Sequence, residues 1–94
     1  MEVTARFLGV FRSVYGKSGF TIKFKDTVLL RDAVKRIVEE LPELKRALID
    51  PELEDPGPNT LILVNGREIS VLNGLDTVLK DGDEVVFLPV VHTG

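Results

Sequence analysis

Only one long segment of the chain repeats its apolar residues with the period of a helix. Between Leu30 and Leu41 these residues fall three and four positions apart, at Leu30, Ala33, Val34, Ile37, Val38 and Leu41. The spacing predicts a helix of about three turns with a single apolar stripe. A second, shorter helix is predicted from Pro42 to Ile49, since proline suits the first position of a helix. One long helix can cover one face of a sheet, so the rest of the chain must supply that sheet.

The other apolar segments have the two-residue period or the composition of strands. The predicted strands are residues 3–12, 20–24, 60–64 and 84–88, and a returning strand begins at 67–70. Turns are predicted at Tyr15–Gly19, at Asn65-Gly66 with its type I′ signal and at Asp81-Gly82, and one helical turn at Asp76–Leu79. The chain is therefore predicted to be α+β, a mixed sheet of four to five strands packed on one main helix.

Two of the predicted strands are apolar on both faces, although the long helix can cover only one. Strands 60–64 and 84–88 are apolar at every position after the first. With Leu8 and Val10, the uncovered side chains would form an apolar patch bordered by Arg6 and Arg12, and such patches mark partner surfaces. The alternative is that the short second helix and the loop at 50–59 cover this face.

Composition excludes several classes of function. The chain has 94 residues and a formal net charge of −3, with twelve basic residues spread among fifteen acidic ones. One domain is expected at this length, and a nucleic-acid partner is not, because phosphate binding requires clustered positive charge. No cysteine is present, so neither disulfides nor thiolate chemistry belong to this chain. No apolar stretch is long enough for a bilayer and the first residues lack a signal-peptide pattern, so we expect a cytoplasmic protein with no membrane partner.

The usual arrangements of catalytic and metal-ligating residues are missing. His92 is the only histidine, and it lies in the last five residues. The acidic, proline-rich loop Asp50–Asn59 lacks the regular spacing of a calcium loop and is interpreted as a solvated linker. The carboxylates of Asp81–Glu84 are interpreted as part of a turn. We therefore expect neither an enzyme nor a metal site.

The last residues carry the remaining chemical possibility. Pro89 ends the final strand, because proline donates no ladder hydrogen bond, and we divide the chain into a domain at 1–89 and a flexible tail at 90–94. At roughly 3.3 Å per residue the tail reaches about 17 Å. Gly94 has no side chain, so its carboxylate can pass along a narrow channel to a nucleotide in another protein. There it can be activated as an acyl-adenylate, which sulfur or an amine then attacks.

The C-terminal third, "LILVNGREISVLNGLDTVLKDGDEVVFLPVVHTG", resembles the MoaD/ThiS family of ubiquitin-like sulfur carriers, together with the related ubiquitin-related modifiers and small archaeal modifier proteins. The matching pieces are "VNG", "GLDTVLKDGDEV" and an apolar strand that ends at a proline and a short tail to glycine. "FLGVFRSVYG" also resembles the first strand and turn of that family, so the resemblance spans the chain.

The resemblance implies a β-grasp (ubiquitin-like) fold and a reactive Gly94. An activating adenylyltransferase would use ATP to adenylate this glycine and convert it to a thiocarboxylate, with no cofactor bound by the carrier itself. Val90, Val91, His92 and Thr93 become the tail that inserts into the partner. Leu8 and Leu88 become apolar residues facing the partner, and Arg12 a basic residue beside them. Thr93 replaces the first glycine of the Gly-Gly end usual in the family, and threonine is bulkier and stiffer.

Three functions remain open at this point. The leading one is a sulfur carrier of the molybdopterin-synthase small-subunit type, whose partners are the activating enzyme and the synthase large subunit or another sulfur-acceptor enzyme. The second is a ubiquitin-like modifier joined to lysines, or a sulfur donor for tRNA thiolation. The third, suggested by Thr93, is a β-grasp interaction module that is never activated.

Overall fold

The computed structural model of the chain describes residues 1–57 and 60–90. A five-stranded sheet has the order β2-β1-β7-β4-β5, and a separate pair is formed by β3 and β6. The strands are β1 (Glu2–Phe7), β2 (Gly19–Lys23), β3 (Val28–Leu29), β4 (Thr60–Val64), β5 (Arg67–Glu68), β6 (Val78–Leu79) and β7 (Glu84–Pro89). β1 and β7 lie parallel at the centre, and their neighbours are antiparallel. The predicted mixed sheet and the α+β class are confirmed.

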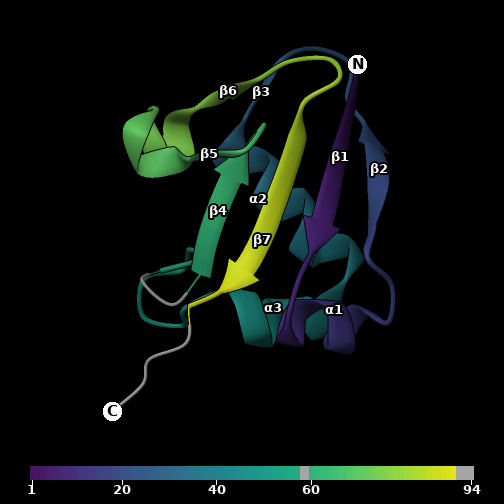
Figure 1. The fold of residues 1–94 in the computed structure, drawn as a ribbon, viewed down its shortest axis with the longest axis vertical. Helices are drawn as coiled ribbons and strands as arrows, with labels where there is room; N and C mark the ends of the chain where they lie inside the picture. Colours follow the sequence, from purple (N-terminus) through teal and green to yellow (C-terminus); the bar gives the residue numbers. More distant parts are fainter. Residues whose placement is uncertain (58–59, 91–94) are drawn as a thin grey trace.

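Three α-helices pack on the sheet: α2 lies behind β4 and β7 in Figure 1, and α3 and α1 lie at the end where β1 and β7 finish. They are α1 (Val10–Tyr15), α2 (Leu30–Glu40) and α3 (Pro42–Leu48), and short 3₁₀ turns follow at Ile69–Val71 and Gly74–Asp76. The apolar stripe of α2 is buried as the spacing predicts, and α3 buries Leu44 and Leu48 in the same core. Phe7 and Phe87 stack at the centre, with ring centroids 5.6 Å apart. The one core therefore lies between the sheet and all three helices.

The first predicted strand is too long. It ends at Phe7 rather than Arg12, and Val10–Tyr15 form α1. Gly9 breaks the strand with φ 59°, a backbone conformation that favours glycine. Phe11 is still buried, now from the helix. The strand alternation and a helical spacing both place Phe7 and Phe11 in the core, so the pattern alone did not separate the two structures.

The segment before β7 also differs from its prediction. The helical turn lies at Gly74–Asp76 instead of Asp76–Leu79, and Val78–Leu79 pair with Val28–Leu29 as a short ladder. In this position the Thr77 carbonyl accepts a hydrogen bond of 2.8 Å from the Leu30 N–H, one of the free donors at the start of α2. The tertiary contact with α2 therefore fixes where the turn ends.

The predicted tight turns are confirmed. Asn65 and Gly66 both have positive φ, 51° and 83°, as a type I′ turn requires. At the second turn the Asp83 N–H donates to the Lys80 carbonyl at 3.1 Å, and Gly82 has φ 86°. Both turns lie at the end of β7 opposite to Pro89, so the chain after Pro89 leaves from the other end of the sheet (Figure 1).

Candidate functional site

β7 ends at Pro89, which pairs with Thr60 of β4 directly before the predicted tail. The Asn65 N–H donates to the Glu84 carbonyl at 2.8 Å, and antiparallel pairs alternate from there between bonded and non-bonded. Thr60 and Pro89 consequently form a non-hydrogen-bonded pair. The missing N–H of Pro89 therefore leaves no unpaired group facing β4.

Four exposed apolar residues belong to segments that meet at the end of β7, where the tail begins. Leu8 follows β1 and is 44% exposed, Val10 and Val14 lie one turn apart on α1 with exposures of 51% and 38%, and Val90 is 37% exposed. α1 contacts β7 at this end of the molecule. We call these four residues the tail-exit cluster. It leaves apolar surface in water around the base of the tail, which is characteristic of a partner surface.

A second apolar surface lies on the sheet face away from the helices. It consists of Leu61, Leu63, Val86 and Leu88, which are half-buried while their neighbours along each strand face the core. Leu61 lies opposite Leu88, and Leu63 opposite Val86. We call these four residues the outer-face patch. α3 packs in the core on the other side of the sheet, so the helix part of the alternative considered for the sequence is wrong.

Charged residues border the outer-face patch as predicted for Arg6. Arg6 pairs with Val86 in the parallel ladder, and its Nε donates to a Glu84 carboxylate oxygen at 2.6 Å. This ion pair is about half exposed, so it contributes at most about 1 kcal/mol to stability. Both partners remain at the rim of the apolar surface.

The three predicted partner-facing residues do not share one strand face. Leu88 belongs to the outer-face patch, and Leu8 lies beside it, since the Leu8 N–H donates to the Phe87 carbonyl at 3.0 Å. Arg12 instead lies exposed on α1. The prediction that it belongs to the first strand is wrong. Val10, which was predicted on the sheet face, also lies on α1. Leu8 therefore joins the outer-face patch to the tail-exit cluster.

The four remaining predicted tail residues, Val91, His92, Thr93 and Gly94, lie outside the described residues. Their roles stay predictions. Val90 is described, and it is partly exposed directly after β7.

Helix α1 is the part of the site that sequence reasoning missed. Its signal is present: Val10, Phe11, Val14 and Tyr15 have the spacing of one helical face, and Gly9 and Gly16 flank the segment. Gly16 ends the helix in the left-handed conformation, where its N–H donates to the Arg12 carbonyl at 2.7 Å. The alternation of the preceding strand hid this short helix.

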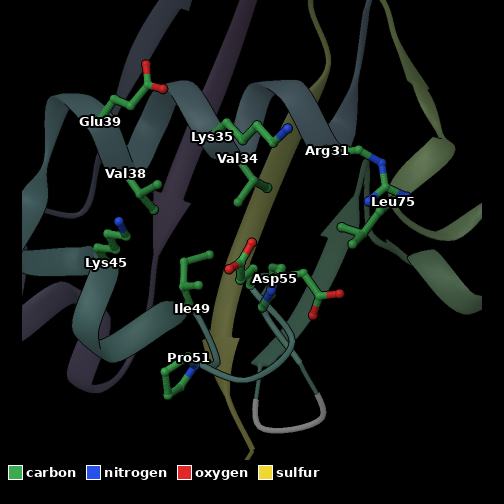
Figure 2. A pocket seen from close by; sticks show the side chains of 12 residues that line it. Arg31, Val34, Lys35, Val38, Glu39, Lys45, Ile49, Pro51, Asp55 and Leu75 are labelled. Atoms are coloured by element: carbon green, nitrogen blue, oxygen red, sulfur yellow. The ribbon is translucent and has the colours of Figure 1, made fainter.

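A groove lies on the helix side of the described residues. This groove of about 550 Å³ runs between α2, the end of α3 and the loop at 50–57 (Figure 2). Val34, Val38 and Ile49 lie in it, and the charges around it balance, three basic against three acidic residues. Within residues 1–57 and 60–90, no buried side-chain polar atom lacks a hydrogen-bond partner. Nothing in the groove therefore points to a particular ligand.

In the two acidic segments, carboxylate oxygens accept hydrogen bonds from backbone N–H groups of the same segment. In the loop, an Asp50 carboxylate oxygen accepts from the N–H groups of Glu52 and Leu53, and Asp55 accepts from Gly57. In the turn, Asp83 accepts from the Lys80 N–H. Across the described ranges, no three His, Cys, Asp or Glu side chains are grouped to hold a metal ion. The turn interpretation of Asp81–Glu84 is confirmed. In the loop, Pro51–Glu54 are exposed and Pro56 is buried.

No helix in the described portion of the chain is long and apolar enough to cross a membrane.

Comparison with known proteins agrees with this geometry. The model of the ThiS family matches residues 5–94. Small archaeal modifier protein 3 of Haloferax volcanii is 35% identical over 95 residues, which cover all of both chains. Small archaeal modifier protein 1 of Methanosarcina acetivorans has a solution structure that superposes with a TM-score of 0.84 at 28% identity, covering 99% of this chain and 96% of that one.

A more distant neighbour is one chain of a two-protein complex. The complex joins subunits 1 and 2 of the molybdopterin-converting factor of Helicobacter pylori. The match has a TM-score of 0.63 and 29% identity, and it covers both chains completely. These neighbours confirm the β-grasp fold that the resemblance implies. The chain belongs to the ThiS family of ubiquitin-like sulfur carriers and protein modifiers.

Proposed function

We propose that the protein is a sulfur carrier that works through a Gly94 thiocarboxylate. The observation that carries the proposal is the end of β7, where Pro89 is followed by an exposed Val90 and the neighbouring segments carry further exposed apolar side chains. Membership of the ThiS family supports it. In this proposal the chain supplies the acyl group and a partner supplies the catalysis.

The chemistry takes two steps in the activating enzyme. A carboxylate oxygen of Gly94 attacks the α-phosphorus of ATP, and pyrophosphate leaves. A sulfide ion then attacks the carbonyl carbon of the acyl-adenylate, AMP leaves, and the product is a thiocarboxylate. Adenylation makes the second step possible, because AMP is a far better leaving group than the oxide of a free carboxylate. The carrier itself binds no cofactor.

The residues between Pro89 and Gly94 serve as the inserting tail. Val90, Val91, His92 and Thr93 span the distance to the partner's nucleotide, about 17 Å with Gly94 included. Thr93 restricts the backbone more than the glycine common in the family. We expect the cognate enzyme to have a channel wide enough for this side chain.

The partner binds around the base of the tail. Leu8, Leu88 and the rest of the outer-face patch supply apolar contact, and Arg12 supplies a charge on α1. We propose the large subunit of molybdopterin synthase as the sulfur acceptor. Support comes from the neighbour that matches this chain over its whole length and was solved in complex with the second subunit of the molybdopterin-converting factor.

A mass measurement tests the first step. The purified chain is incubated with its cognate activating enzyme, ATP and sulfide, and its intact mass is recorded. We expect the gain that corresponds to exchange of one oxygen for sulfur, and no change without ATP or when Gly94 is deleted. If the product is then mixed with the synthase large subunit and the molybdopterin precursor, the added mass is lost as sulfur is transferred. A thiocarboxylate that this subunit leaves intact would direct the search to another acceptor.

A second function has its own support. A modifier protein is the relative that matches this chain at 35% identity over the full length of both. As a modifier, the same activated Gly94 would form an isopeptide bond with a lysine of another protein. Enrichment of the protein from cells followed by digestion would give lysine peptides branched with the C-terminal residues. A carrier without conjugation gives the thiocarboxylate and no branched peptides.

A further inference from the structure

Gly9 meets the last residue of β7 in an unusually close contact. A Cβ added to Gly9 would lie 2.9 Å from Cγ and 3.1 Å from Cδ of Pro89. Real Cβ atoms essentially never come that close to another heavy atom. The ring of Pro89 therefore lies where any other residue at position 9 would place its side chain.

Gly9 differs in this respect from most glycines of the described chain. Gly16, Gly66, Gly74 and Gly82 also have positive φ, but a Cβ built on any of them meets no atom within 4 Å. Those four glycines serve the backbone conformation of turns and a helix end. Glycine is needed at position 9 for two reasons: the backbone has a positive φ of 59°, and the ring of Pro89 leaves no room for a side chain.

Backbone hydrogen bonds hold the chain on both sides of this contact. The Leu8 N–H is bonded to the Phe87 carbonyl at 3.0 Å, and the Gly9 carbonyl accepts from the Ser13 N–H at 3.2 Å at the start of α1. These two bonds hold the backbone on both sides of Gly9. A side chain at position 9 would thus push the proline ring, and with it the chain that continues at Val90.

We propose that Gly9 is a positioning residue that sets the direction in which the tail leaves the domain. The inference rests on the proposed function, because direction matters only if the tail must enter a partner. The rigid φ of Pro89 and its seat on Gly9 together aim Val90 and the residues that follow. Misplacement of reacting groups by about 1 Å can cost about a hundredfold in rate. A displacement of the Pro89 ring would therefore change the direction in which Val90 approaches the partner.

The test compares four variants in adenylation by the cognate activating enzyme. Gly9→Ala introduces both the clash and the unfavourable φ. Pro89→Ala removes Cγ and Cδ, the two atoms that clash, and the double variant Gly9→Ala/Pro89→Ala keeps the unfavourable φ without the clash. Gly16→Ala is the control for a substitution at positive φ in open space. Thermal unfolding is measured for each, and kinetics are recorded well below the melting temperature.

We expect Gly9→Ala to lower kcat by at least about tenfold with a smaller change in KM, because docking surfaces remain while the carboxylate is misdirected. The double variant has no clash, so its kcat should recover to about that of Pro89→Ala, which lacks the rigid φ of proline. Gly16→Ala should stay within about twofold of the original chain. If Gly9 had a purely structural role, the kcat of each variant would instead fall in proportion to its loss of stability. A kcat of Gly9→Ala near that of the original chain, or a folded double variant without recovery, would overturn the inference.

A second measurement separates this inference from the proposed function. The backbone amide of Val90 is followed by ¹⁵N NMR in the free protein. Its signal should shift in Gly9→Ala and stay unchanged in Gly16→Ala. Because residue 89 directly precedes this amide, the double variant is compared with Pro89→Ala, and the two signals should coincide. If the original chain is never adenylated while these shifts occur, the proposed function fails and the seating of Pro89 on Gly9 stands. If the signal does not move in Gly9→Ala, the seating itself is refuted.

Discussion

The two ends of β7 use their side chains in opposite ways. At the start of the strand, polar groups are paired within the molecule: Asn65 donates from Nδ2 to Asp83 at 2.9 Å and accepts from the Glu84 N–H at 2.9 Å. Asp81 accepts from the Glu2 N–H at 2.7 Å. At the other end, Leu8, Val10, Val14 and Val90 leave apolar surface in water.

The proposed function assigns different roles to the two ends. A turn whose amides and carboxylates bond one another lowers the free energy of the folded chain and offers little to a partner. Exposed apolar groups around the start of a tail do not stabilise the free protein, but they gain free energy when a partner covers them. We therefore assign stability to the turn end and recognition to the tail end, and substitutions at each can break this division.

The largest effect is expected between the two ends, at Phe87. Its side chain is fully buried and stacks on Phe7. Phe87→Ala should lower the free energy of unfolding by about 3–5 kcal/mol, because it opens a cavity in the core. Urea denaturation measures this loss. A loss below about 1 kcal/mol would mean that β7 is not the central support of both ends.

A charge in the tail-exit cluster should affect recognition and not stability. Val10→Glu places a carboxylate where the partner is expected to cover an apolar side chain, and should raise the KM for the activating enzyme at least about tenfold. The matched control is Val71→Glu, since Val71 is also exposed but lies on the 3₁₀ turn beyond β5. Both should change stability by less than about 0.5 kcal/mol. Equal KM values for the two variants would contradict the assignment of recognition to the tail end.

The smallest effect is expected at the turn end, and there it should be confined to stability. Asn65→Ala removes two side-chain hydrogen bonds and leaves alanine at φ 51°. The loss should be about 1–2 kcal/mol in thermal or urea unfolding, while activation is unchanged under folding conditions. Asn65→Gly separates the causes, because it removes the same bonds and tolerates the positive φ. A drop in activation without a drop in stability would show that the turn end also contacts the partner.

The sequence predicts the sheet and the long helix because their apolar periods are long and unambiguous. The stripe from Leu30 to Val38 and the strands at 60–64 and 84–88 all match. The turn at Asn65-Gly66 matches because few residue pairs accept positive φ at both positions.

The errors occur where a short segment takes its structure from tertiary contacts. α1 has only six residues, and its burial of Phe11 satisfies the same alternation as a strand. The ladder of Val78–Leu79 depends on Val28–Leu29, fifty positions earlier in the chain. The contact of Pro89 with Gly9 joins residues eighty positions apart, so no local sequence pattern predicts it. The tail residues from Val91 to Gly94 were identified by family resemblance, which the family match over residues 5–94 supports at the level of the whole chain.

The most direct test of the account is the intact mass of the chain after incubation with its cognate activating enzyme, ATP and sulfide. The account predicts the replacement of one oxygen by sulfur at the C-terminus, with the new mass confined to the peptide that ends in Gly94. It also predicts that deletion of Gly94 abolishes the product while the domain stays folded. An unchanged mass with an enzyme that activates other carriers of the family, and with every candidate activating enzyme from the same cell, would contradict the central claim.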